Sequence, residues 1–188
     1  MAAGQKDKIV LGIDPGTQLL GFGVVSLHNG KCTYIDMGVV NLKNEKDHFV
    51  TLKKITERVG ALIEKYMPDE MAIEAPFYGK NPQVMLKLGR AQGAAIAAAL
   101  VREIPIFEYA PRSVKVAVSG NGAASKEQVA TMVQRLLGID CPQEHADATD
   151  ALAIALCHCY NPESPSGTYS KNTSWESFVK NNPQKIIK

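Results

Sequence analysis

The chain has 188 residues, of which 45% are hydrophobic, and its 21 Lys and Arg residues outnumber its 19 Asp and Glu residues by two. This length and apolar content suit one globular domain with a real core and exclude a wholly disordered chain. The surplus of positive charge comes from residues 161–188, which leaves residues 1–160 formally neutral. Overall charge therefore neither indicates nor excludes nucleic-acid binding, and only a local basic patch would do so.

The cysteine pattern and the hydropathy bear on the compartment. The four cysteines form no CxxC pair and no secretory leader precedes the first strand, so we expect a cytoplasmic protein. The longest apolar run, residues 91–101, is interrupted by Gln92 and is too short to cross a membrane. In the Cys157-His158-Cys159 triplet, helical neighbours two apart point away from each other, which favours buried thiols over a metal site.

The first third of the chain reads as β-structure. Residues 8–14, 20–28 and 31–41 are predicted to be strands. The last two are joined by Asn29-Gly30, a dipeptide that accepts the positive φ angles of a tight hairpin. The sheet is therefore expected to start antiparallel.

The apolar period then changes from two residues to 3.6. One face of the next predicted helix carries Leu52, Ile55, Val59, Leu62, Ile63 and Tyr66. Pro68 ends this helix before a short apolar strand, residues 71–77. Asn81 followed by Pro82 is typical of a helix start, and the helix should run to about Glu103. Its centre, GAAIAAAL, consists mainly of small residues that would let another backbone come close.

A second alternation of strand and helix follows. Residues 104–110 are predicted to be a strand and 112–118 a short helix. Ser125 and Gln128 have the spacing of a capping box, and Gly138 is a suitable terminator for the helix that they begin. The residues expected to face inward from that helix are Val129, Met132, Val133, Leu136 and Leu137.

These elements predict an α/β fold. Residues 146–160 are apolar nearly all round, which indicates a buried helix. We expect a mixed sheet, antiparallel at first and then parallel, with helices on both faces, within one domain of residues 1–160. Residues 161–188 are polar and rich in Pro, Ser and Asn, and are predicted to be a flexible tail in which Trp175 and Phe178 could dock a short turn.

Four carboxylates interrupt apolar patterns: Asp14, Glu74, Asp147 and Asp150. Taken singly, Asp14 could start a turn, Glu74 could belong to a buried ion pair, and Asp147 could cap its helix. Asp150 lies one turn further into the helix, on the same face as Asp147. Taken together, the four are best explained by convergence on a hard divalent cation, Mg²⁺ or Mn²⁺, which suits phosphodiester hydrolysis.

The residues after Asp14 are expected to make room for such a site. Pro15, Gly16 and Gly21 should turn the chain sharply away from Asp14, so that a metal and a phosphate fit beside it. The next strand then resumes as scaffold.

Four segments follow one another between about Lys8 and His158: GIDPGTQLLGFGVV, AIEAPFYGKNPQVMLKLGRAQG, FEYAPRSVKVAVSGNGAASKEQV and HADATDALAIALCH. Together they resemble the RuvC-type Holliday junction resolvases, which have a ribonuclease H-like fold. A GIDPGT-like turn alone also occurs as the phosphate loop of sugar kinases and actin-like ATPases, whereas four segments at these spacings are specific. The chain departs from many relatives at Ala75-Pro76, where they have Gln directly after the glutamate.

The resemblance implies a homodimer that resolves four-way DNA junctions by paired symmetric nicks in recombination and repair. Asp14, Glu74, Asp147 and Asp150 match the catalytic carboxylates that hold Mg²⁺, for which Mn²⁺ is a possible substitute. The helix of residues 82–103 resembles the family's dimer element. It could also pack against the sheet of its own chain, and one helix can do both. A branch-migration motor complex is the implied protein partner.

The resemblance also implies DNA contacts. Phe77 matches an aromatic wedge that enters the base stack, although a core Phe at a strand end is the simpler structural reading. Lys115 and Lys126 match lysines near the scissile phosphate, and Lys126 is counted among the catalytic residues. Lys126 also lies in a helix first turn, where a phosphate would relieve its conflict with the helix dipole. Backbone contacts and plain solvation are both open for Lys80, Lys87, Arg90 and Arg112.

Three other functions stay open from the residues alone. One is an RNA-processing nuclease of the same fold, and another is a catalytically silent junction-binding protein. The third, from a different class, is an actin-like or sugar-kinase-like nucleotide binder that uses the Asp14 turn. That class needs a second phosphate loop and an adenosine pocket, for which the chain is short.

Overall fold

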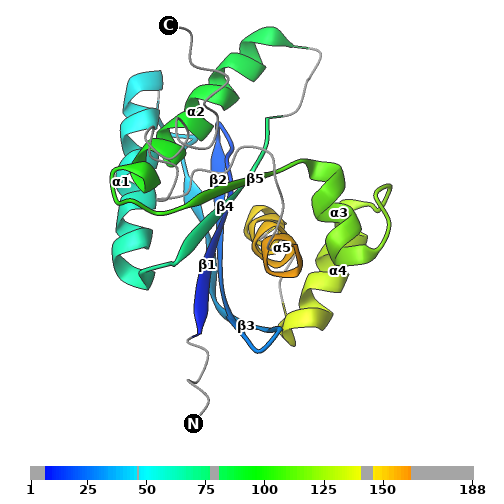
Figure 1. The fold of residues 1–188 in the computed structure, drawn as a ribbon. Helices are drawn as coiled ribbons and strands as arrows, with labels where there is room; N and C mark the ends of the chain where they lie inside the picture. Colours follow the sequence, from blue (N-terminus) through cyan, green and yellow to red (C-terminus); the bar gives the residue numbers. More distant parts are fainter. Residues whose placement is uncertain (1–6, 46, 77–80, 141–145, 162–188) are drawn as a thin grey trace, which may run out of the picture.

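The computed structural model describes residues 7–45, 47–76, 81–140 and 146–161, which contain one five-stranded sheet (Figure 1). The strand order is β3-β2-β1-β4-β5. Strands β1, β2 and β3 pair antiparallel, and β4 and β5 continue from β1 in parallel. The bounds are β1 Lys8–Asp14, β2 Leu19–His28, β3 Lys31–Asn41, β4 Glu70–Glu74 and β5 Ile106–Tyr109. The predicted mixed sheet is confirmed.

Helices cover both faces of this sheet, as predicted. Figure 1 shows α1 and α2 on one face and α5 on the other, with α3 and α4 packed outside α5. The bounds are α1 His48–Tyr66, α2 Pro82–Leu100, α3 Pro111–Ser119, α4 Lys126–Leu137 and α5 Ala146–Tyr160. No helix in the described ranges is long and apolar enough to cross a membrane.

Alternation along β1 divides the core in two. Leu11 and Ile13 pack into the cluster that α1 and α2 cover, whereas Val10 packs into the cluster around α5. Because successive strand residues point to opposite faces, Gly12 and Asp14 also face α5. The carboxylate at the end of β1 is therefore aimed at the last helix of the fold.

Local signals in the sequence set several of the element ends. Asn29 and Gly30 have φ angles of 49° and 78° in the β2–β3 hairpin. The Asn81 side chain accepts hydrogen bonds from the first turn of α2, and Ser125 and Gln128 form the predicted capping box of α4. The sequence predicted these features because each depends on the conformation or hydrogen bonding of backbone groups only a few residues away.

Several element ends and one core residue differ from the predictions; strand β5, for example, is Ile106–Tyr109 instead of residues 104–110. Strand β4 ends at Glu74 instead of residue 77, because Pro76 has no N–H to hydrogen-bond with β5. The last backbone hydrogen bond between the two segments runs from Ala75 N to the Tyr109 carbonyl oxygen, at 2.9 Å. Helix α2 ends at Leu100, three residues early, before a turn in which Glu103 has a φ of 56°. Leu136 of α4 was expected to face inward but is 40% exposed.

Helix α5 is buried from Ala148 to Cys159 except at Asp150, which is half-buried, so the all-round apolar pattern predicted its environment correctly. The Cys157-His158-Cys159 triplet points in different directions, as its spacing predicts. Cys159 hydrogen-bonds with Cys32 of β3, and Cys157 with Asn161. His158 bonds the Tyr109 hydroxyl through Nδ1 at 2.7 Å and the Glu70 carboxylate through Nε2.

Candidate active site

Two carboxylates come together at the carboxyl ends of β1 and β4. These strands are parallel, and Ile13 pairs with Ile73, so Asp14 and Glu74 occupy equivalent positions on neighbouring strands. Both side chains fall on the face that α5 covers. Strand register therefore brings together two residues that are far apart in the sequence.

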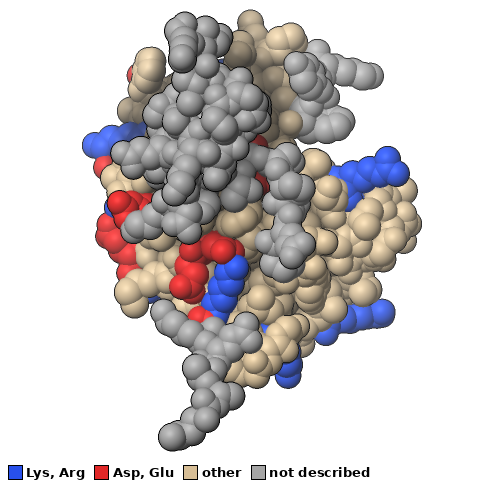
Figure 2. Space-filling model, viewed as in Figure 1, with Lys and Arg blue, Asp and Glu red and all other residues tan. Residues whose placement is uncertain are grey.

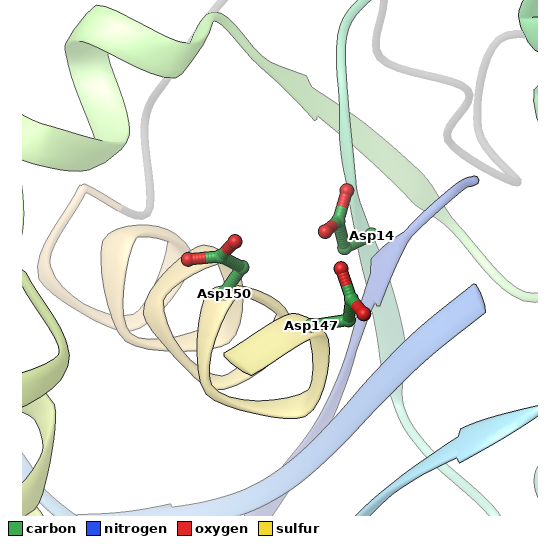
Figure 3. Close-up of side chains that lie close together, drawn as sticks. All are labelled: Asp14, Asp147 and Asp150. Atoms are coloured by element: carbon green, nitrogen blue, oxygen red, sulfur yellow. The ribbon is translucent and has the colours of Figure 1, made fainter. Parts of the chain in front are cut away.

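Helix α5 adds two further carboxylates from its first turns. Ligand atoms of Asp14, Asp147 and Asp150 all lie within 4.8 Å of one another. Figure 3 shows these carboxylates around a shared space between the strand and the helix. Asp147 lies inside the first turn of α5, so the N-cap interpretation of this residue is wrong. Glu74 is outside this group of three but lines the same pocket as Asp14 and Asp150.

Three glycines let α5 approach the sheet closely enough for this arrangement. A Cβ at Gly12 would lie 2.1 Å from the Ala151 carbonyl oxygen, and one at Gly21 would lie 2.0 Å from the Asp147 carbonyl oxygen. At Gly23 it would lie 2.7 Å from the Leu152 nitrogen. Gly12 pairs with Gly23, and Gly21 pairs with Asp14, so the three form a notch on adjacent strands.

Gly21 therefore differs from its predicted role. It lies within β2, not in the turn after Asp14, and its missing side chain makes room for the backbone of α5. Gly16 does belong to the turn, where a Cβ would come 1.9 Å from the Leu19 carbonyl oxygen.

The carboxylates carry negative charge that the protein only partly compensates. Burial raises the pKa of Asp14 from 3.8 to about 7, with further increases from Glu74 and Asp150. The pKa of Glu74 is also raised, first by burial and then by Asp150. Lys126 lowers the pKa of both carboxyl groups. Such a cluster favours either bound protons or a bound cation.

The all-oxygen donor set fits a hard divalent cation. Asp14, Asp147 and Asp150 supply carboxylate oxygens from two rigid elements, and Mg²⁺ and Mn²⁺ prefer such ligands. A cation here would also offset the charge repulsion that raises the pKa of Asp14.

Two lysines border the carboxylates. Lys126 Nζ donates a hydrogen bond to Asp150 Oδ2 at 2.7 Å, and this contact raises the lysine pKa. Lys115 of α3 lowers the pKa of Glu74 and lines the same pocket, which has a volume of about 290 Å³. Lys115 and Lys126 therefore lie beside the acidic group, where a phosphate would sit. On the face shown in Figure 2, the Lys and Arg side chains of the described residues are scattered and are not gathered into one patch.

The other predicted DNA-binding residues lie outside this pocket. Lys87 lines a different pocket, beyond the β1–β2 turn, and Arg112 is exposed on α3 over Gly122. Phe77 and Lys80 fall outside the described residues. The structure therefore brings together Asp14, Glu74, Asp150, Lys115 and Lys126 around one pocket, with Asp147 beside it.

Sequence reasoning missed the part played by Gln92. This buried side chain donates from Nε2 to the Glu74 carbonyl oxygen at 3.1 Å and to Glu108 Oε1 at 3.0 Å. It therefore ties α2 to the end of β4 that carries Glu74. The available signal was a single polar residue within an apolar run, since a buried amide needs partners.

The chain is similar to proteins of one family. A family model described as crossover junction endodeoxyribonuclease RuvC matches residues 10–158. A protein of that name from Christiangramia forsetii is 53% identical over 97% of this chain and 94% of its own length. Another, from Porphyromonas gingivalis, is 50% identical over 96% of this chain and 98% of its own length.

Solved structures of Holliday junction resolvases have a similar fold. RuvC of T. thermophilus, in complex with a Holliday junction substrate, superposes with a TM-score of 0.75 at 34% identity and covers 82% of this chain and 94% of that one. The yeast mitochondrial Holliday junction resolvase shares the fold, with a TM-score of 0.63 at 18% identity over 85% of this chain and 80% of that one. The chain therefore belongs to the crossover junction endodeoxyribonuclease RuvC family.

Proposed function

We propose that this protein is a structure-selective endonuclease that resolves four-way DNA junctions by paired nicks, using Mg²⁺ held by its carboxylates. The observation that carries the proposal is the meeting of Asp14, Asp147 and Asp150 within 4.8 Å on the fold of this family. Glu74, on the wall of the same pocket, is the fourth ligand in this proposal. Mn²⁺ has the same ligand preference and is the expected substitute.

Each side chain has a distinct task in the proposed reaction. The aspartates of β1 and α5 hold the cation in a fixed place, because both elements are packed into the core. When bound, the cation supplies activation of water and stabilisation of the charge that develops on the phosphate. Lys126 and Lys115 border the pocket and orient the scissile phosphate by charge. Lys126, now bonded to Asp150, is well placed to exchange that partner for a phosphate oxygen.

Junction cutting is the direct test of this function. A labelled synthetic four-way junction incubated with the protein and Mg²⁺ should be nicked on two opposing strands, while EDTA should stop the reaction. A linear duplex of the same sequence should be cut far more slowly, and an RNA competitor should not inhibit at matched nucleotide concentration. Binding of the junction without nicking, in the presence of Mg²⁺, would contradict the proposal and favour a silent junction binder.

Paired nicks require two active sites, and the proposed second site comes from a C2 dimer through α2. The exposed residues along this helix include Leu86, Arg90, Gly93, Ala97 and Leu100. They alternate at spacings of four and three residues, which places them on one face. The small side chains at Gly93 and Ala97 would let two copies of the helix come close.

Ala97→Glu is expected to convert the dimer to a monomer, since it puts a charge at the centre of this face. Sedimentation velocity should detect the change, and the two nicks in one junction should become uncoordinated. Ala61→Glu, the same change at an exposed position of α1, is the matched control and should leave the dimer intact. If Ala97→Glu sedimented like wild type, the dimer interface would not be the exposed face of α2.

The remaining parts of the proposal concern the DNA path and the chain's organisation. Phe77 is proposed as a wedge in the junction, and Lys80, Lys87 and Arg112 as backbone contacts that contribute affinity and salt dependence. Residues 1–160 are proposed as the nuclease domain, consistent with the end of α5 at Tyr160. A branch-migration motor as partner stays a prediction of the family resemblance.

A further inference from the structure

A second polar pocket lies beyond the β1–β2 turn, on the side of α1 and α2. Its volume is about 410 Å³. Buried Leu42, Thr51 and Ala91 contribute to its lining, together with the exposed residues Lys43 and Lys87. Its location, size and basic side chains distinguish it from the acidic pocket.

The charged groups of this pocket that have no ion-pair partner are positive. Among the described residues, Lys43 and Lys87 form no ion pair. Glu45 is the acidic residue of the lining, and its Oε1 accepts from Lys54 Nζ at 2.7 Å. The acidic group is thus already compensated, while two ammonium groups are available to an anion.

One residue of the lining, His48, has an unsatisfied polar atom. His48 Nε2 is inaccessible to water and has no hydrogen-bond partner in the part of the chain that the structure describes. An unpaired buried ring nitrogen is costly, on the order of 1–3 kcal/mol. A turn of the ring toward the pocket would give this nitrogen an acceptor if an anion were bound there. Thr17 and Gln18 add a hydroxyl and an amide to the same lining.

The pocket adjoins the acidic site through the chain itself. Thr17 follows Asp14 by three residues, so their Cα atoms are at most about 11 Å apart. The Gln18 carbonyl accepts from Leu42 N at 2.8 Å, which fixes the turn to the end of β3 beside Lys43. Duplex DNA carries a phosphate on each strand about every 3.4 Å of helix axis, so DNA positioned at Asp14 has further phosphates within this reach.

We propose that this pocket binds a backbone phosphate of the junction DNA, a few nucleotides from the phosphate that is cut or on a neighbouring strand. Lys43 and Lys87 neutralise the phosphate, and Thr17, Gln18 and His48 supply hydrogen bonds. The inference rests on the proposed nuclease function for the identity of the DNA. It assigns Thr17, Gln18, Lys43 and His48 a role in positioning the junction relative to the carboxylates.

The test measures the salt dependence of junction binding in protein that cannot cut, the Asp14→Asn variant without divalent cation. Adding Lys43→Gln should weaken binding about 3-fold to 10-fold and lower the slope of log K against log salt by about 1, since one phosphate contact is lost. Lys43→Arg should keep the slope. Lys31→Gln, the same change in the hairpin at the opposite end of the sheet, is the matched control and should behave as wild type.

A second arm separates DNA phosphate from a free anion. Inorganic phosphate, compared with chloride at equal ionic strength, should compete with the junction weakly, and less in Lys43→Gln than in the parent, because it can enter the same pocket. Unchanged affinity and slope in Lys43→Gln would overturn the inference. The inference would also be overturned if Lys43→Gln changed the competition by inorganic phosphate and left junction binding unchanged. Nicking by the protein with Asp14 restored is scored separately, so failure of the nuclease proposal remains distinguishable from failure of this pocket.

Discussion

Replacing Asp14 with Asn is expected to abolish junction nicking and yet to stabilise the metal-free protein at alkaline pH. Activity should fall by at least about 1,000-fold, because the one ligand contributed by β1 is lost. Stability should rise because a half-buried carboxylate beside Glu74 and Asp150 is replaced by a neutral amide of the same shape. The two effects have one cause, the concentration of negative charge in the pocket.

The pH dependence follows from the raised pKa. The folded protein holds the Asp14 proton up to about pH 7, whereas the unfolded chain releases it near pH 3.8. Stability is therefore fully present below pH 3.8 and is lost as pH rises toward 7. The maximum loss is roughly 4 kcal/mol for a shift of this size, and solvent access at the pocket reduces it to about 1–3 kcal/mol.

Urea denaturation at pH 5 and pH 8, with EDTA, would measure this effect. The free energy of unfolding of Asp14→Asn should exceed that of wild type more at pH 8 than at pH 5. Mg²⁺ should stabilise wild type and leave Asp14→Asn nearly unchanged. Asp140→Asn, the same exchange at an exposed position, is the control. Equal stability of Asp14→Asn and wild type at both pH values would show that the carboxylates do not repel one another as the geometry requires.

The second large effect is expected from a methyl group in the glycine notch. In Gly21→Ala, the new Cβ would come 2.0 Å from the Asp147 carbonyl oxygen, and backbone on both sides limits the relief. Helix α5 must move away from the sheet, and Asp147 and Asp150 move with it. We expect a loss of roughly 1–3 kcal/mol in the free energy of unfolding, as for other overpacked cores.

Cation affinity should fall more than the loss of stability alone would suggest. A displacement of about 1 Å exceeds the tolerance of a metal site, and calorimetric Mn²⁺ binding should weaken by at least about 10-fold. Gly89→Ala adds the same methyl group where no atom lies within 4 Å, and it should fold and bind Mn²⁺ normally. If Gly21→Ala bound Mn²⁺ as tightly as wild type, the distance between α5 and the sheet would not determine cation affinity.

The elements that the sequence predicted well are those set by short-range patterns. The hairpin at Asn29 and the cap at Ser125 depend on neighbouring residues, so their signals are local. The acidic residues were predictable because each breaks an apolar pattern. Charged groups rarely lie near a core without a partner, and this made Asp150 conspicuous.

The features that were missed depend on contacts between distant segments. Gly21 resembled a turn residue because the packing of α5 onto β2 is not visible along the chain. Gln92 resembled an interruption of an apolar helix, and its partners on β4 and β5 follow from the sheet order. One error had a local cause instead: the strand predicted beyond Glu74 ignored Pro76, which has no N–H to donate to the sheet.

The notch that seats α5 also sets the order in which the protein becomes active. Asp14 belongs to the first strand and Asp147 to the last helix, so the cation site joins the two ends of the domain. During synthesis the earlier carboxylates have no helical partners until nearly the whole domain has left the ribosome. The contacts that complete the site span more than a hundred residues of sequence, and such long-range contacts form slowly. A partly made chain therefore lacks the means to cut DNA, and the capacity for cleavage arises only with the final docking step.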